Sequence, residues 1–201
     1  INQLKFEDAL KKASIEGVFD AHQYVNAFPV KKHDHISIPA GTIHCSGKNT
    51  LVLEISMAAY IFTFKLWDWG RLGLDGKPRP VHLDHGFKNL QYDRQTSWVK
   101  NEFINPIENI DDYTERTGLH VLEPLSSYRV KFKDKHVIQL RSTVQMVTVV
   151  EGKKITVLHQ DFDAIHYHYA ETFIIPAKVT SLTLSCQDEK ECMIIYAEVN
   201  A

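Results

Sequence analysis

A histidine directly after a proline and glycine turn is the residue of this sequence best suited to hold a metal. The segment 38–44, IPAGTIH, has the composition of a strand end, a turn and the start of a second strand. Proline fixes φ and glycine permits a tight bend, so the imidazole of His44 is expected at a rigid corner. A fixed ring suits a metal ligand, whereas the simpler alternative is a histidine whose ring bonds a backbone carbonyl.

Three other pairs of histidines lie close together in the sequence, and each could be a metal-binding pair or two ordinary histidines. Residues two apart on an extended strand face the same side, so two of these pairs could in principle hold a metal between them. We favour the simpler alternative of ordinary, satisfied histidines for both, while the third pair follows a proline-rich turn. The three pairs are His33 with His35, His166 with His168, and His82 with His85. Cys45, next to His44, is expected to be a packed thiol.

A lysine and an arginine near two indoles are the candidate oxyanion-binding groups. If the segment 60–69 is a strand, Lys65 shares one face with Trp67 and Trp69, and Asp68 lies on the opposite face. Lys65 could then hold a phosphate or an enediolate oxygen, with the indoles as a surface for a sugar ring. The alternative is a lysine that extends from an exposed strand into water. Arg71, just past the strand, has the same two interpretations.

The overall composition excludes several classes of protein. With 201 residues, 44% of them hydrophobic and 24% charged, the chain is globular and long enough to bury a core. No apolar run reaches the roughly 20 residues of a membrane span, and no signal-peptide pattern opens the chain. The net charge of −2 gives no basic field for nucleic acid. The three cysteines, without a CxxC pair, favour ordinary buried thiols in a reducing, cytoplasmic environment.

The order of elements predicts an all-β chain with a short helical segment at its start. Residues 4–13 follow helical spacing, and Gly17 is expected to end that helix. Short runs of β-branched and aromatic residues then alternate with turns, as is typical of a sandwich or barrel. A polar connector at 92–116 separates two units, 1–116 and 117–201. The expected strands lie at 36–38, 50–55, 60–69, 81–83, 119–122, 129–132, 137–140, 144–150, 155–159, 173–175, 181–185 and 193–199.

A short internal repeat supports two similar β units. The segment 35–40, HISIPA, is echoed by the segment 172–177, TFIIPA, and each follows an acid, Asp34 or Glu171. In this register, His44 of the first copy is matched by Ser181 of the second. Only the first copy is then expected to keep a metal ligand.

The sequence resembles the type I mannose-6-phosphate isomerases, which are zinc-dependent and built from cupin (β jelly-roll) domains. The motifs that carry the resemblance are VKK at 30–32, IPAGTIH at 38–44, LVLEI at 51–55, WDWGR at 67–71, GKPR at 76–79 and HL at 82–83. They match the C-terminal half of the catalytic cupin. The resemblance therefore implies two cupin-like jelly-roll units. The first, 1–116, is the C-terminal half of the metal-binding catalytic cupin with a helical lead-in, and the second, 117–201, is metal-free.

By this resemblance, His44 occupies the position of the family's last zinc ligand, and Lys65 or Arg71 supplies the catalytic cation. The implied reaction interconverts mannose 6-phosphate and fructose 6-phosphate through an enediol, as part of cytoplasmic carbohydrate metabolism. A sugar phosphate is thus the implied partner. Such chemistry needs a metal, a base and a cation for the oxyanion, and no base can be named in this sequence.

The sequence departs from the family's pattern in two places. The family's other metal ligands, in a His-Pro-containing strand and a Glu, lie N-terminal to the segment that opens this chain, and no His-Pro occurs here. One imidazole cannot hold catalytic zinc, so the metal site is expected to be incomplete. The family's Thr-Tyr-Arg is TFK here, so Lys65 keeps the charge but loses the planar fork of arginine. Glu54 could support a metal ligand, or it is a solvated carboxylate.

The chain begins with Ile1 rather than methionine. We therefore expect a fragment or processed chain that is inactive or slow by itself and on which the N-terminal part of the parent protein packs. One alternative is a non-catalytic sugar-binding or structural cupin module. Another, a metal-dependent oxygenase, needs at least two histidines and a carboxylate around one metal, and the sequence offers no such set at a persuasive spacing.

Overall fold

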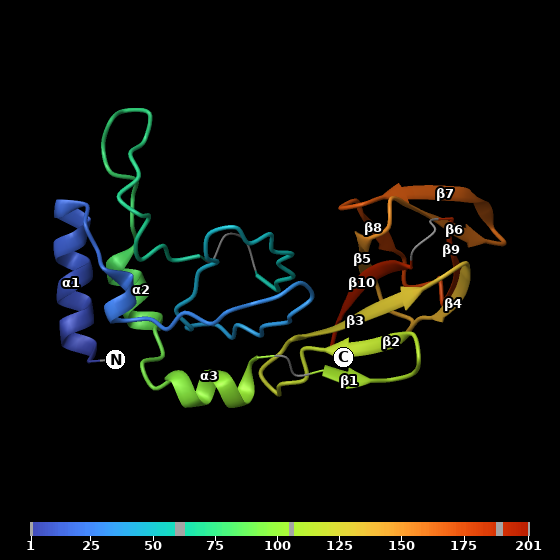
Figure 1. The fold of residues 1–201 in the computed structure, drawn as a ribbon, viewed down its shortest axis with the longest axis horizontal. Helices are drawn as coiled ribbons and strands as arrows, with labels where there is room; N and C mark the ends of the chain where they lie inside the picture. The colour runs from blue at the N-terminus through green and yellow to red at the C-terminus, as the bar shows by residue number, and fades with distance from the viewer. Residues whose placement is uncertain (1, 59–62, 105–106, 188–190, 201) are drawn as a thin grey trace. The chain divides into compact units, whose positions relative to one another are not determined.

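The computed structural model describes residues 2–58, 63–104, 107–187 and 191–200 (Figure 1). The chain forms two compact units. The first comprises Ile1–Asp34, Ile38–Glu54 and Ala58–Ile104, and the second comprises His35–Ser37, Ile55–Met57 and Asn105–Ala201. The chain passes between the two units more than once, and the last passage follows Ile104.

The first unit begins with the predicted helix, α1 (Gln3–Glu16). Asn2 caps its start, because its side chain accepts a hydrogen bond from the Lys5 amide at 3.1 Å. Gly17 ends it as predicted, with φ of 77° and its N–H bonded to the Ala13 carbonyl at 2.8 Å. The buried face carries Phe6, whose ring lies 5.4 Å from Tyr24 and 6.4 Å from Tyr92. An aromatic cluster therefore anchors the helix.

The strands predicted at 36–38, 50–55 and 81–83 are wrong. The described residues before β1 (Ile107–Asn109) form no strand; besides α1 they form the 3-10 turn η1 (Ala21–Gln23) and two short helices, α2 (Leu83–Asn89) and α3 (Thr96–Glu102). The expected strand at 60–69 is also not formed at 63–69, and residues 60–62 lie outside the described residues. A strand needs a partner, and Leu51 and Val52 remain 87% and 60% exposed, so this apolar run pairs with no sheet of the described chain.

The second unit contains two antiparallel sheets, as a jelly roll does. The chain is therefore mostly β with a short N-terminal helix, and its sheets are ordered β1-β2-β3-β10-β5-β8 and β4-β9-β6-β7. The strands are β1 (Ile107–Asn109), β2 (Thr114–Thr117), β3 (Leu125–Phe132), β4 (Lys135–Gln139), β5 (Gln145–Glu151), β6 (Lys154–His159), β7 (Phe162–His168), β8 (Thr172–Ile175), β9 (Ser181–Cys186) and β10 (Cys192–Val199).

Most strand predictions for this half are confirmed. The patterns at 129–132, 137–140, 144–150, 155–159, 173–175, 181–185 and 193–199 correspond to β3 to β6 and β8 to β10. The strand expected at 119–122 is wrong. The strand that pairs with β3 is instead β2, which ends before this segment. β7 was not predicted, since its side chains are mostly exposed and show no buried alternation. β1 and β2 were not predicted either, because they lie in or at the end of the stretch expected to be a polar connector.

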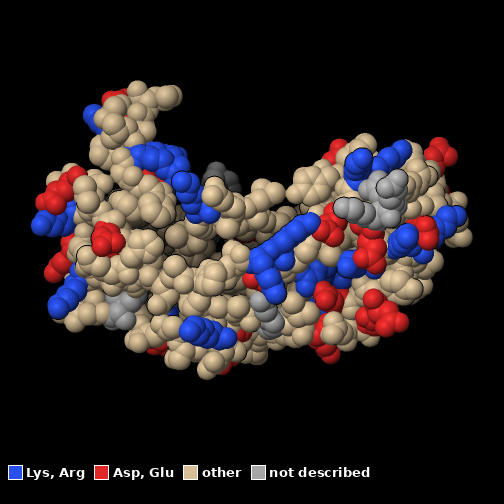
Figure 2. Space-filling model, viewed as in Figure 1, with Lys and Arg blue, Asp and Glu red and all other residues tan. Residues whose placement is uncertain are grey.

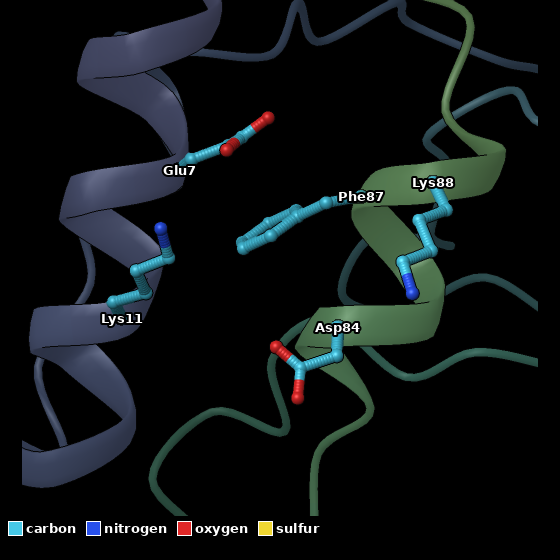
Figure 3. A pocket seen from close by; sticks show the side chains of 5 residues that line it. All are labelled: Glu7, Lys11, Asp84, Phe87 and Lys88. Carbon is cyan, nitrogen blue, oxygen red and sulfur yellow. The ribbon is translucent and has the colours of Figure 1, made fainter.

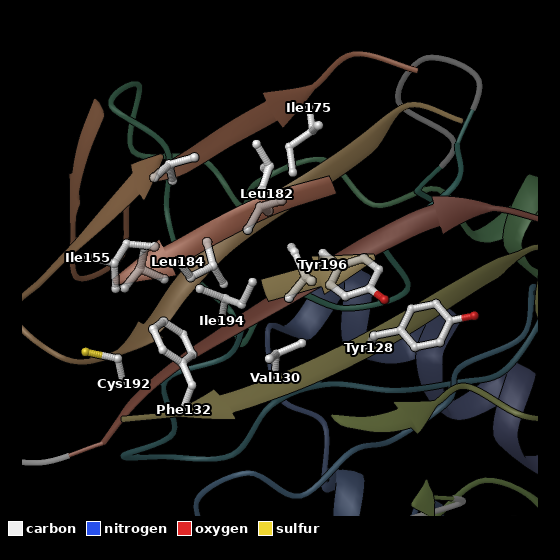
Figure 4. Packing of buried hydrophobic residues seen from close by; sticks show 14 of the residues in the cluster. Tyr128, Val130, Phe132, Ile155, Ile175, Leu182, Leu184, Cys192, Ile194 and Tyr196 are labelled. Atoms are coloured by element: carbon white, nitrogen blue, oxygen red, sulfur yellow. The ribbon is translucent and has the colours of Figure 1, made fainter. Parts of the chain in front are cut away.

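The core of the second unit lies between the two sheets. In β10 the alternate residues Cys192, Ile194 and Tyr196 point inward and are at most 8% exposed. They pack with inward residues of β3, β6 and β9 such as Val130 and Leu184 (Figure 4). Each aliphatic side chain buried in this way contributes about 1.5–3 kcal/mol.

The cysteines differ from the expectation of ordinary thiols. Cys186 at the end of β9 and Cys192 at the start of β10 form a disulfide, with Cα atoms 5.9 Å apart. Cys45 is exposed rather than packed. Cysteine usage therefore no longer argues for a reducing compartment.

In the part of the chain that the structure describes, no helix is long and apolar enough to cross a membrane. On the face of the second unit seen in Figure 2, positive and negative side chains are interspersed, so this face presents no field of a single sign.

Candidate functional site

The proline and glycine segment before His44 forms the rigid corner that the sequence predicts. The Thr42 amide donates to the Pro39 carbonyl at 3.1 Å, which closes a four-residue turn. Gly41 has φ of 84°, and a Cβ at this position would lie 2.6 Å from the Asn89 carbonyl oxygen. Only glycine fits here, because both the backbone conformation and the close approach of the α2 end exclude a side chain.

Arg94 holds this turn from outside, which the sequence did not reveal. Its Nη1 donates to the carbonyls of Pro39 and Ala40 at 3.0 and 2.7 Å and to the Thr42 hydroxyl at 2.6 Å. Its guanidinium also lies 5.0 Å from the ring centre of Trp98 in α3. A residue more than 50 positions along the chain therefore fixes the corner before His44.

The ring of His44 is exposed, and its Nδ1 lies 2.9 Å from the Thr42 carbonyl oxygen. A carbonyl only accepts, so this contact assigns the proton to Nδ1 and leaves the lone pair on Nε2. A metal-binding histidine commonly has this arrangement. The carbonyl contact is also the simpler alternative named above, so it does not by itself assign a metal.

The internal repeat has the same turn in its second copy. There the Val179 amide donates to the Pro176 carbonyl at 2.9 Å, between β8 and β9. Ser181, the counterpart of His44, is the first residue of β9. The two copies thus share the turn but not the flanking strands.

The remaining candidate ligands do not gather around His44. The φ of 70° at His33 breaks the extended geometry that would place it beside His35. His166 bonds the Thr156 hydroxyl at 3.0 Å, and the His168 amide donates to Glu171 at 2.7 Å. Among the described residues, no three His, Cys, Asp or Glu side chains form a group that could hold a metal ion. These residues therefore do not by themselves fit a zinc site.

The two predicted cations meet at Asp68. Lys65 Nζ lies 3.4 Å from Asp68 Oδ2, and Arg71 Nη2 lies 3.4 Å from Oδ1. A third cation, Arg79, places its Nε 3.2 Å from Oδ2. The Asp68 side chain is 8% exposed, whereas those of Lys65, Arg71 and Arg79 are 35%, 60% and 45% exposed. One buried carboxylate thus orients three cations whose outer N–H groups remain in reach of solvent.

The backbone turns sharply at this cluster, which overturns the alternation expected for a strand. The Arg71 amide donates to the Asp68 carbonyl at 2.9 Å, and both Trp69 and Gly70 have positive φ. Asp68 therefore joins Lys65 instead of facing away from it. The two indoles do lie together, with ring centres of Trp67 and Trp69 4.9 Å apart.

Asp68 and Arg79 were missed as site residues. The spacing of Lys65, Asp68 and Arg71 at i, i+3 and i+6 is a usable signal for a turn that gathers them. The return of Arg79 depends on the hairpin in which Leu72 bridges Pro78, and the sequence did not predict it.

This cluster can bind an anion. Three cations face a single carboxylate, so the local charge is positive, and guanidinium groups suit phosphate or carboxylate oxygens. A cavity of about 20 Å³, lined in part by Trp67, Arg71 and Arg79, adjoins it and has room for about one water molecule. A larger anion would therefore bind on the outer side of the cations.

A second hollow lies between α1 and α2 and has about 440 Å³ (Figure 3). Its walls carry both signs of charge, from Glu7, Lys11 and Asp84 among others. The Tyr92 hydroxyl donates to Glu7 at 2.9 Å; burial and this carboxylate raise the pKa of Tyr92. The mixed charges favour no ligand class over another.

Comparison with known proteins gives a partial relationship. No family model matches the chain. Over 89 residues, 44% of this chain, it is 26% identical to a mannose-6-phosphate isomerase from Streptococcus mutans, and over 62 residues, 31% of the chain, it is 34% identical to the Bacillus subtilis protein ManA. The chain is similar in part to mannose-6-phosphate isomerases. The matches span only 27% and 19% of those proteins.

The solved mannose 6-phosphate isomerase from Bacillus subtilis extends the similarity to structure. It superposes with a TM-score of 0.50 over 68% of this chain and 40% of its own, at 16% sequence identity. At that identity the match shows a shared cupin fold and not a shared activity. The chain thus shares a fold and a distant, partial sequence similarity with mannose-6-phosphate isomerases.

Proposed function

We propose that this chain contributes to an aldose–ketose isomerase that interconverts mannose 6-phosphate and fructose 6-phosphate. The observation that carries the proposal is the set of three cations that the buried Asp68 carboxylate holds on the surface of the first unit. The partial similarity to mannose-6-phosphate isomerases supports it. The alternative role of this cluster is a purely structural ion-pair network.

Lys65 and Arg71 are the proposed catalytic cations. Isomerisation through an enediol places negative charge on a sugar oxygen, and preorganised N–H donors stabilise that charge. Asp68 supplies the preorganisation, since it fixes both side chains before the sugar arrives. Arg79 completes the set and suits the phosphate, because a guanidinium can bond two phosphate oxygens at once. The base that moves the proton is not assigned.

His44 remains the proposed metal ligand, because the contact of its Nδ1 with Thr42 leaves Nε2 available. Since the described residues do not fit a zinc site by themselves, we assign no step of the reaction to the metal. We propose that further ligands come from polypeptide outside these 201 residues, and that the chain alone binds zinc weakly. The greater length of the relatives is compatible with this.

The same proposal assigns a role to each half of the chain. Residues 1–116 would act as half of a catalytic cupin, and residues 117–201 as a second cupin without a metal, whose sheet is extended by β1 and β2 from the preceding connector. A cytoplasmic location also remains a proposal, as part of carbohydrate metabolism.

Deuterium incorporation tests the proposal even if turnover is slow. In D₂O, an enediol route exchanges the C2 proton of mannose 6-phosphate, and proton NMR follows the loss of that signal. We expect slow exchange with the wild-type chain and zinc, a loss of about tenfold or more in K65M, and no change in K77M, which alters an exposed lysine of the hairpin. Exchange equal to the protein-free blank, or equal in K65M and wild type, would contradict the proposal.

A non-catalytic cupin module is the second candidate. It is favoured by the placement of both sheets in the second unit and by the lack of a three-ligand group among the described residues. In that case the chain binds sugar or a partner without any C2 exchange.

A further inference from the structure

One end of the core of the second unit is polar. Glu198 of β10 lies opposite Ser126 of β3 and Gln145 of β5, and all three side chains point between the sheets. They are 3%, 1% and 0% exposed. The next inward pair is Tyr128 and Tyr196, whose rings stack at 4.8 Å. We call Ser126, Tyr128, Gln145, Tyr196 and Glu198 the polar end of the core.

The two tyrosines separate this end from the aliphatic core. Figure 4 shows both phenol hydroxyls pointing away from the side where Phe132 and Cys192 lie. Burial, with the neighbouring ring of Tyr128, raises the pKa of Tyr196, so its hydroxyl keeps the proton and can donate. Two aromatic rings and two hydroxyl groups thus line one side of the polar end.

Several buried polar atoms of this end make no hydrogen bond within the described residues. These atoms are both carboxylate oxygens of Glu198, Oε1 of Gln145 and Nε of Arg116. Arg116 is oriented to this end because its Nη2 donates to the Ser126 hydroxyl at 3.3 Å. Buried polar groups are almost always satisfied by protein, water or a ligand, so three acceptors and one donor here need a further partner.

The one ion pair that Glu198 makes in the described chain involves Oε1 alone, and Oε2 has no hydrogen-bond partner among the described residues. Arg141 Nε lies 3.2 Å from Glu198 Oε1, but the Arg141 side chain is 62% exposed. The side-chain amide of Gln145 donates through Nε2 to the Arg141 carbonyl at 2.8 Å, which fixes the backbone of Arg141 beside this end. Arg141 therefore covers the polar end from the solvent side.

The charges select the class of ligand. One carboxylate and two guanidinium groups lie at the polar end, so a cation would meet Arg116 and Arg141, and an anion would meet Glu198. The buried atoms without a hydrogen bond are acceptors and a donor, and they lie next to the ring pair of Tyr128 and Tyr196. Hydroxyl groups both donate and accept, and sugar rings pack on aromatic faces, so a polyhydroxylated neutral molecule matches all of these groups.

We propose that the polar end of the second unit binds a neutral polyhydroxylated ligand of the monosaccharide class, which enters when the Arg141 side chain moves aside. Ligand hydroxyls donate to Glu198 and Gln145 and accept from Arg116 and Tyr196. This site lies wholly within the second unit and does not depend on the isomerase proposed above. It takes sugars without a phosphate group, unlike the cation cluster at Asp68.

Saturation-transfer difference NMR on the full chain tests the proposal with mannose, glucose and myo-inositol as probes. We expect signal for at least one of them, and an affinity about tenfold or more lower in E198Q. E191Q is the matched control, because Glu191 pairs with Lys131 at the surface. Y196F keeps the ring stack and removes one donor, so it should weaken binding less. R141Q removes the cover and should leave binding equal or stronger.

Three results would overturn the proposal. They are no signal from any probe with folded protein, equal binding in wild type and E198Q, and a high-resolution structure in which ordered water alone satisfies Glu198 and Gln145. K65M separates this site from the isomerase proposal. The neutral sugars should bind K65M unchanged, and a failure of C2 exchange would leave this site untouched.

Discussion

Lys65 and His82 exchange two hydrogen bonds. The Lys65 amide donates to His82 Nδ1 at 3.1 Å, and the His82 amide donates to the Lys65 carbonyl at 2.7 Å. This pairing anchors the backbone of Lys65 just before the turn that carries Asp68. Because Nδ1 accepts, the ring proton of His82 is on Nε2.

The first prediction concerns this pair. In H82A the Lys65 amide loses its acceptor, so its hydrogen exchange should become faster, and the stability of the first unit should fall by about 1 kcal/mol. Exchange of the Lys65 amide measured by NMR checks this. H85A, whose ring stacks on Phe64 and bonds no Lys65 atom, should leave that amide unchanged. Equal hydrogen exchange of the Lys65 amide in H82A and wild type would show that His82 does not protect this amide.

The second prediction concerns the corner before His44. G41A adds a Cβ 2.6 Å from the Asn89 carbonyl oxygen and should destabilise the protein by about 1–3 kcal/mol more than G76A. Gly76 also has positive φ but has nothing within 4 Å of the added carbon, so it is the matched control for backbone strain. Chemical denaturation measures the difference, and equal losses would show that the turn is not held against α2.

The third prediction concerns the disulfide. Cys186 and Cys192 close a short loop, so reduction should lower stability by about 2 kcal/mol in a chain-entropy treatment. The melting temperature should fall when dithiothreitol is added to wild type and to C45A. It should not respond to dithiothreitol in the C186A/C192A double variant. A response that persists there, or is lost in C45A, would exclude this pairing.

The fourth prediction concerns pH. Burial, with the positive charge of Arg129 second, lowers the pKa of His35 below its usual value of 6.5. The unfolded chain therefore takes up a proton first as pH falls. The contribution of neutral His35 to stability is complete above pH 6.5 and is lost as pH decreases from there toward the folded pKa.

Urea denaturation between pH 7.5 and 5 checks this sign. The slope of stability against pH should be shallower in H35Q than in wild type, and H85Q should retain the wild-type slope. A stability that rises as pH falls through this range would contradict the burial of His35.

Local pattern predicted the second unit well. In β9, the alternation of the buried residues Leu182, Leu184 and Cys186 with half-buried neighbours is a signal that short stretches of sequence contain. The helix of residues 3–16 was equally accessible, because its apolar spacing and Gly17 are local signals, whereas its N-cap Asn2 was recognised only in the structure. β7 lacks a buried alternation, and its existence depends on pairing with β6.

The structure of the first unit could not be predicted in the same way, because it depends on contacts between residues that are distant along the chain. Leu51 and Val52 have the composition of a strand, yet no sheet of the described chain receives them. Arg94 reaches the turn at Pro39, and Arg79 reaches Asp68, across separations that no periodicity encodes. The candidate residues Lys65 and Arg71 came from the expected strand and from the family resemblance, whereas the structure showed the carboxylate that joins them, Asp68.

Binding of mannose 6-phosphate by isothermal titration calorimetry tests the central claim most directly. The account predicts that the wild-type chain binds the sugar phosphate, that D68N binds at least about tenfold more weakly because its cations lose their common anchor, and that D75N, changed at an exposed hairpin carboxylate, equals wild type. Absence of binding by the folded wild-type chain, or equal affinities in wild type and D68N, would contradict it.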